Sequence, residues 1–204
     1  MAGQAPTAVA LDAPDLETAA RWAALVAPHV SVLKIGLELY LRYGPEVVAS
    51  VRGASGAHIF LDLKLHDIPA TVAGAARAVA RLRPSLLTVH AAAGAAAIRA
   101  AADAIPATRI VAVTVLTSLS EADLGHVGLA GPVGDEIMLI TPGVRPAGAD
   151  ANDQARVATP EDALRSGADL LVIGRPITGA ADPGAAAATI AASLRRAEAV
   201  PGRR

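Results

Sequence analysis

The sequence of 204 residues is long enough for one domain with a sizeable core and short for two, so we expect a single domain over residues 1–204. With 18 basic and 19 acidic residues, its formal net charge of -1 gives no electrostatic case for nucleic-acid or membrane binding. The absence of cysteine excludes disulfides and thiolate metal sites. No apolar run is long enough to span a bilayer and the first residues do not resemble a signal peptide, so we expect a cytoplasmic protein.

Short apolar segments alternate with helical patterns along the chain. The patterns predict strands over residues 7–12, 32–36, 58–64, 86–91, 109–116, 138–143 and 169–174, and helices over residues 15–27, 46–52, 71–83 and 95–104. This alternation indicates parallel β-α-β units, and the polar residues at the strand ends favour a (β/α)8 TIM barrel, where chemistry collects at those ends. An open doubly wound sheet is the alternative, but no glycine-rich dinucleotide fingerprint follows the first strand.

Seven strands are recognisable where an eight-stranded barrel needs one more. Residues 120–137 are too few for the fifth helix and the whole sixth unit, because one β-α-β unit takes roughly 30 residues. Either the sequence omits residues, with an unnatural join around residues 131–134, or the protein truly lacks the sixth unit. We favour omission, which an intact mass clearly above 20.4 kDa would support.

Three charged residues stand close together where the third strand ends. Asp62 and Lys64 are two apart, so they share one face of the strand, and Asp67 follows in the loop. Taking such charges out of water is costly unless they pair with each other or with a ligand. A surface ion-pair ladder is one interpretation, and a preorganised charge cluster aimed at a substrate is the one we favour.

This motif, Asp62-x-Lys64-x-x-Asp67 followed by Ile68-Pro69-x-Thr71, resembles the signature of the orotidine 5′-phosphate decarboxylase family, which makes UMP in the last step of pyrimidine synthesis. Further matches to the family cover most of the chain and are Leu-Lys-Ile-Gly-Leu at 33–37, Val-Thr-Val-Leu-Thr-Ser at 113–118, Thr-Pro-Gly-Val-Arg-Pro at 141–146 and Val-Ile-Gly-Arg-Pro at 172–176.

The resemblance implies a cofactor-free decarboxylation driven by electrostatics. Lys64 would stabilise the carbanion at C6 of the pyrimidine and protonate it, and Asp62 would favour loss of the carboxylate. Asp67 would hold Lys64 in place. Lys34 would extend the charge network, and a strand-end ion pair is the alternative interpretation of this residue. The resemblance also implies a homodimer in which Asp67, Ile68 and Thr71 act on the active site of the partner subunit.

Other substrate contacts are expected around the ribose, the pyrimidine and the phosphate. A phosphate needs a fixed cation and backbone N–H donors, which barrels commonly supply in the loops after their last two strands. Arg175 beside Gly174 fits that role, and an arginine that caps a helix is the alternative. Arg145 resembles a family residue on the phosphate side and is equally well interpreted as a solvated loop charge. Thr117 is expected to hydrogen-bond near the pyrimidine or ribose, and a buried threonine that bonds to backbone is a slightly weaker alternative. The expected substrate-binding residues are Asp12, Lys34, Asp67, Ile68, Thr71, Thr117, Arg145, Gln154, Gly174 and Arg175.

We expect no metal and no cofactor, because the histidines lack a carboxylate spacing that suggests a metal site. His90 is interpreted as a packing residue. The enzymatic alternative is a sugar-phosphate relative, a 3-keto-gulonate-phosphate decarboxylase or hexulose-phosphate synthase, which the motifs at 67–71 and 141–146 argue against. Magnesium-dependent turnover of a keto-sugar phosphate would favour it. A noncatalytic phosphate-binding barrel is the alternative if the missing unit is real.

Overall fold

The computed structural model describes residues 4–114, 140–146 and 158–198. Its strands are β1 (Ala5–Ala10), β2 (Val30–Gly36), β3 (Ile59–Leu65), β4 (Leu86–His90), β5 (Arg109–Val113), β6 (Ile140–Thr141) and β7 (Leu170–Ile173). Its helices are α1 (Leu16–Val26), α2 (Leu37–Tyr43), α3 (Pro45–Ser55), α4 (Pro69–Ala80), α5 (Gly94–Ala104), α7 (Pro160–Arg165), α8 (Arg175–Thr178) and α9 (Pro183–Glu198), with 3-10 turns η1 (Ala27–His29) and η2 (Ala91–Ala93).

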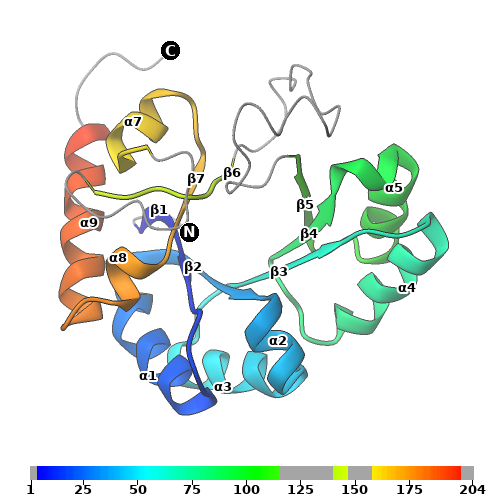
Figure 1. The fold of residues 1–204 in the computed structure, drawn as a ribbon, viewed down its shortest axis with the longest axis horizontal. Coiled ribbons are helices and arrows are strands. Elements are labelled where there is room, and N and C mark those ends of the chain that lie inside the picture. Colours follow the sequence, from blue (N-terminus) through cyan, green and yellow to red (C-terminus); the bar gives the residue numbers. More distant parts are fainter. Residues whose placement is uncertain (1–3, 115–139, 147–157, 199–204) are drawn as a thin grey trace.

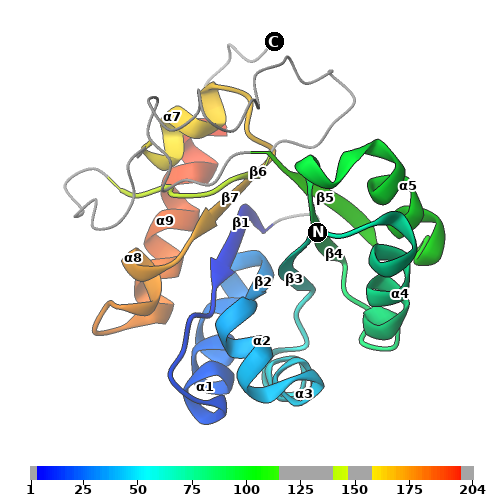
Figure 2. The same cartoon turned by 45° about the vertical axis from the view of Figure 1, so that its right-hand side comes forward.

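The described strands form one parallel sheet in the order β5-β4-β3-β2-β1-β7-β6. The sheet curls, and the helices cover its outer face (Figures 1 and 2). This is the strand-helix alternation of the predicted TIM-type barrel, with seven of its eight strands present in the part of the chain that the structure describes. Within the described residues β5 and β6 stand at the two ends of the sheet and do not pair with each other.

The two faces of the sheet have separate apolar cores, because successive residues of a strand point to opposite faces. Residues such as Val9, Leu33 and Leu61 are fully buried between the sheet and its helices. The inner face of the curl holds a smaller cluster, made of Ala8, Ala10, Val32, Phe60, Leu86, Leu170 and Val172. Continuing that inner-face alternation toward the carboxyl ends leads from Val32 to Lys34 and from Phe60 to Asp62.

The predicted element types are confirmed, and the boundaries differ by a few residues. Strand β1 begins and ends two residues earlier than expected, so Asp12 lies beyond the strand. Strand β5 ends at Val113, and the last two residues of the expected strand, 115 and 116, lie outside the described residues. Helices α2, α7, α8 and α9 were not predicted, and α2 was missed because it follows β2 directly, after Gly36. The described helices are all too short or too polar to span a bilayer.

The buried side chains of the outer core should dominate the stability of the fold. Leu33 on β2 is fully buried, so Leu33→Ala should lower the free energy of unfolding by about 2–5 kcal/mol through lost burial and a residual cavity. The matched change Leu41→Ala removes a side chain that is 78% exposed and should cost less than about 0.5 kcal/mol. Urea denaturation of both variants tests this, and equal losses would contradict the core assignment.

Candidate active site

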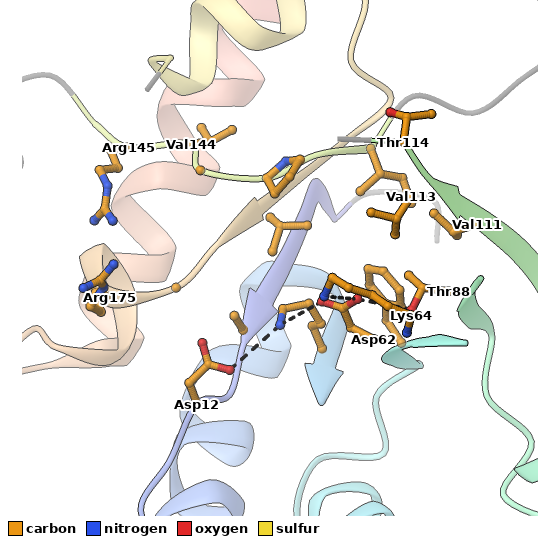
Figure 3. A pocket seen from close by; sticks show the side chains of 18 of the residues that line it. Asp12, Asp62, Lys64, Thr88, Val111, Val113, Thr114, Val144, Arg145 and Arg175 are labelled. Carbon is orange, nitrogen blue, oxygen red and sulfur yellow. Dashed lines mark hydrogen bonds and ion pairs between the residues drawn. The ribbon is translucent and has the colours of Figure 1, made fainter. Parts of the chain in front are cut away.

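A cavity of about 360 Å³ opens at the carboxyl ends of the strands, inside the curl of the sheet (Figure 3). Its apolar lining includes residues of the inner-face cluster, among them Ala10, Phe60 and Val172. Its charged and hydroxyl-bearing lining residues are Asp12, Lys34, Asp62, Lys64, Thr88, Thr114, Arg145 and Arg175. Most of the residues expected from the sequence to form the site therefore meet in one place.

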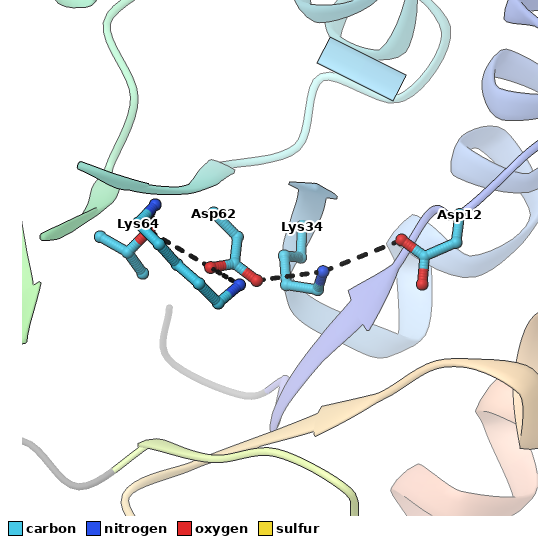
Figure 4. A network of polar contacts seen from close by, with 5 residues as sticks. Asp12, Lys34, Asp62 and Lys64 are labelled. Atoms are coloured by element: carbon cyan, nitrogen blue, oxygen red, sulfur yellow. Dashed lines mark hydrogen bonds and ion pairs between the residues drawn. The ribbon is translucent and has the colours of Figure 1, made fainter. Parts of the chain in front are cut away.

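Four of these residues form a row of alternating charge (Figure 4). The Lys64 Nζ atom lies 2.8 Å from Asp62 Oδ1, and Lys34 Nζ lies 3.3 Å from Asp62 Oδ2. Lys34 Nζ is also 3.9 Å from Asp12 Oδ1. The row comes from the ends of β1, β2 and β3, which are adjacent in the sheet, so the topology itself brings these charges together.

Asp62 is the centre of this row, with an ammonium group on each carboxylate oxygen. Burial alone would raise the pKa of the Asp62 carboxyl, but Lys34 and Lys64 outweigh it, and the pKa lies below its ordinary value. Asp62 is therefore a carboxylate at neutral pH in a site where its side chain is only 13% exposed. The interpretation of Asp62 and Lys64 as a surface ladder does not fit this burial.

Gly36 leaves room for the row. A Cβ atom at this position would lie 3.3 Å from Lys34 Nζ and 3.4 Å from Asp12 Oδ1, so any side chain would press on the ion pair. The backbone angles of Gly36 are ordinary extended ones that do not require glycine. The reason for a glycine here is therefore steric, because a side chain would crowd the ion pair.

Asp67, Ile68 and Thr71 do not line the cavity of their own chain. Asp67 is exposed, its Oδ1 atom accepts a hydrogen bond from the backbone N–H of Ile68 at 2.7 Å, and it makes no ion pair with Lys64. Ile68 is 65% exposed, and Thr71 is exposed on the first turn of α4. The expectation that Asp67 holds Lys64 in place is not met within one chain.

Arg145 and Arg175 lie on the same side of the cavity (Figure 3). Arg145 is only 5% exposed, so its interpretation as a solvated loop charge is wrong. Its backbone N–H donates to the carbonyl of Ala158, which ties the segment after β6 to the start of the next one. Arg175 begins the short helix α8 directly after Gly174, and both residues line the cavity. Thr117 and Gln154 lie outside the described residues.

Sequence reasoning missed two residues that line the cavity and one contact near it. Thr88 on β4 contacts both Asp62 and the backbone of Lys64, and Thr114 lines the cavity just after β5. His90 stacks on His66, with ring centroids 4.9 Å apart, so it is not an isolated packing residue. The sequence signal that could have found Thr88 is its place on the inner face, two residues after Leu86.

The His90 side chain is also bound by the backbone two residues further along the chain. Its Nδ1 atom accepts a hydrogen bond from the backbone N–H of Ala92 at 3.2 Å. Partial burial lowers the pKa of His90, and the nearby His66 and Lys64 lower it further, so the imidazole is neutral at pH 7. Among the described residues, no three His, Cys, Asp or Glu side chains converge as a metal site would require.

Comparison with known proteins adds independent evidence. The model of the orotidine 5′-phosphate decarboxylase / HUMPS family matches residues 6–133 and 128–190. Orotidine 5′-phosphate decarboxylase from Thermobifida fusca is 63% identical, with 97% of this chain and 99% of that protein covered. Orotidine 5′-phosphate decarboxylase from Frankia casuarinae is 51% identical, with 96% of this chain and 89% of that protein covered. The crystal structure of orotidine 5′-phosphate decarboxylase from Lactobacillus acidophilus superposes with a TM-score of 0.75 at 28% identity, covering 97% and 100%.

The same comparisons locate the shortened region. The alignment with the Thermobifida protein has 230 positions but covers 97% of 204 residues, or about 198, so about 32 positions hold residues of the relative alone. That difference is close to one β-α unit. The two family matches meet at residues 128–133, where the join was expected. The full sequence has 204 residues without a break, so the favoured expectation of omitted residues is wrong and the chain itself is shorter.

The position of Asp62 between two lysines predicts how its neutralisation affects stability. Because Asp62→Asn leaves two neighbouring ammonium groups without their shared counter-charge, it should lower the free energy of unfolding at pH 7 by about 1–3 kcal/mol. The folded pKa of Asp62 is lowered, so this difference should be present above its ordinary value of 3.8 and disappear as the pH falls through the folded pKa.

Chemical denaturation of both proteins from pH 7 downward measures this difference. Glu38→Gln is the control, because it breaks an exposed ion pair with Arg42 and should cost less than about 0.5 kcal/mol. An Asp62→Asn protein as stable as the parent at pH 7 would contradict the assigned network.

Proposed function

The chain belongs to the orotidine 5′-phosphate decarboxylase / HUMPS family, and we propose from this premise that it converts orotidine 5′-phosphate to UMP and CO2. The observation on which the proposal rests is the ordered row Asp12, Lys34, Asp62 and Lys64 at the cavity wall, in a chain 63% identical to a named orotidine 5′-phosphate decarboxylase.

The proposed chemistry follows from where the charges lie. Cleavage of the bond between C6 and the carboxylate carbon releases CO2 and leaves the electron pair on C6, with no adjacent π system to delocalise it. An ammonium group fixed beside that carbon stabilises the pair without reorganisation. Lys64 then donates a proton to C6, which gives UMP and a neutral amine that recovers its proton from water.

Asp62 acts on the bound substrate, whereas Lys64 acts on the carbanion. Its low pKa keeps it anionic, so the substrate carboxylate would be placed next to a second negative charge. That repulsion is relieved when neutral CO2 departs, so Asp62 favours the transition state over the bound substrate. Lys34 compensates the charge of Asp62 on its other oxygen, and through Asp12 it connects this end of the site to the ribose hydroxyls.

We assign the substrate phosphate to the side of the cavity where Arg145 and Arg175 lie, away from Lys64. Arg145 and Arg175 both line it there, and guanidinium groups suit the geometry of phosphate oxygens. Gly174 allows close approach of the backbone beside Arg175. Gln154 and Thr117 complete the proposed substrate contacts, at the phosphate and near the pyrimidine or ribose respectively.

We propose further that the active protein is a cytoplasmic homodimer with shared sites. Support comes from the residues that stand away from their own cavity. Asp67 has no cationic partner among the described residues, and apolar Ile68 is exposed beside it. A second copy that covers this loop would bury Ile68 and bring Asp67, with Thr71, to a neighbouring Lys64.

The first test concerns Lys64. Wild-type protein in excess chelator should form UMP and CO2 from orotidine 5′-phosphate, and Lys64→Ala should lower kcat by at least about 1,000-fold, since both the electrostatic stabilisation and the proton donor are lost. Glu38→Gln is a control remote from the cavity. Tight binding of UMP by folded wild-type protein without any turnover would contradict the proposal.

The second test concerns the shared site. If Asp67 acts across the interface, Asp67→Ala and Lys64→Ala should each be nearly inactive alone. A mixed dimer then contains one site with both residues intact, so random reassociation of equal amounts should restore about a quarter of the wild-type activity. Activity that does not rise after subunit exchange, verified by mass spectrometry of differently tagged chains, would count against a shared site.

A further inference from the structure

We propose that Thr88 is a positioning residue that holds Lys64 and Asp62 in their reactive arrangement through its single hydroxyl group. The proposal rests on the proposed function for its kinetic consequences and on the geometry of β3 and β4 for its structural ones. Thr88 is separate from the charged motif in the sequence and lies on the neighbouring strand.

The backbone at Lys64 departs from a regular strand. Its φ angle is +48°, in the left-handed region that residues other than glycine rarely adopt. Such a conformation persists only where the surroundings impose it, and it is often found at functional sites. Something near Lys64 must therefore hold the chain there.

The strand pairing shows where the distortion is absorbed. Leu61 pairs with Leu87 and Leu65 pairs with Val89, so four steps along β3 correspond to two along β4. Residues 62–64 form a bulge opposite Thr88, and a bulge leaves ladder groups without their usual partners while it re-aims side chains. Lys64 lies inside this bulge.

Thr88 supplies the missing partner. Its Oγ1 atom accepts a hydrogen bond from the backbone N–H of Lys64 at 2.7 Å and donates one to Asp62 Oδ1, 3.2 Å away. One hydroxyl can do both, because it has one proton and two lone pairs. Thr88 is only 1% exposed, so water does not compete for these bonds.

These contacts close a small ring. Thr88 joins the Lys64 backbone to Asp62, and the Lys64 Nζ atom returns to the same Asp62 oxygen at 2.8 Å (Figure 3). The hydroxyl thus holds the Lys64 backbone directly, and it also holds the Asp62 carboxylate to which the Lys64 ammonium group binds. Without it the strained backbone loses its anchor, and the ammonium group loses its defined position.

The test uses the isosteric change Thr88→Val, which keeps the shape and removes the hydroxyl. We expect kcat to fall about 10- to 100-fold with KM changed less than about threefold, because misplacing a reacting group mainly affects the transition state. Thr88→Ser restores the hydroxyl and should keep kcat within about threefold of wild type.

Thr7→Val is the matched control. Thr7 is also 1% exposed on a strand of the same sheet, and its Oγ1 atom has no hydrogen-bond partner among the described residues. This variant should leave kcat unchanged. Folding of each variant is checked by its thermal transition, and if Thr88→Val does not fold, the comparison is made between Thr88→Ser and Thr88→Ala.

A crystal structure of Thr88→Val, or of Thr88→Ala if Thr88→Val does not fold, tests the inference without relying on turnover. We expect Lys64 to leave the left-handed region or its Nζ atom to move away from Asp62 Oδ1. An unchanged Lys64 geometry, kcat within threefold of wild type, or Thr88→Ser as impaired as the hydroxyl-free variant would overturn the assignment. An inactive wild type would refute the proposed function, and the crystal structure would still decide the role of Thr88.

Discussion

The contact of one buried carboxylate with two ammonium groups is the interaction on which the rest of the site depends. Asp62 is costly to bury, and Lys34 and Lys64 repay that cost by occupying both of its oxygens. The same arrangement keeps Asp62 ionised and confines Lys64 to one position. Stability and proposed catalysis therefore rely on the same charges, so a neutralising change at any of them should alter both.

The sheet order explains how this row can persist in a shortened chain. The row comes from β1, β2 and β3, which lie in the middle of the order β5-β4-β3-β2-β1-β7-β6. The lost β-α unit belongs between β5 and β6, at the two ends of the described sheet. The charges are thus supported on both sides by paired strands, whereas the lost unit belongs between the two outermost strands of the described sheet.

The sequence was sufficient for the alternation of elements and for the face shared by Asp62 and Lys64, since both follow from simple periodicity. It did not predict the left-handed backbone of Lys64 or the bulge, because these depend on how β3 pairs with β4. Thr88 was missed for the same reason. The burial of Arg145 could not be foreseen either, as a loop arginine becomes buried only through tertiary packing.

The most direct test of the account is a crystal structure of the 204-residue chain with UMP bound. We expect C6 of the uracil ring to face Lys64 Nζ beside Asp62, the ribose hydroxyls to lie toward Asp12 and the phosphate to lie toward Arg145 and Arg175. UMP bound outside this cavity, or with its C6 atom turned away from Lys64, would contradict it.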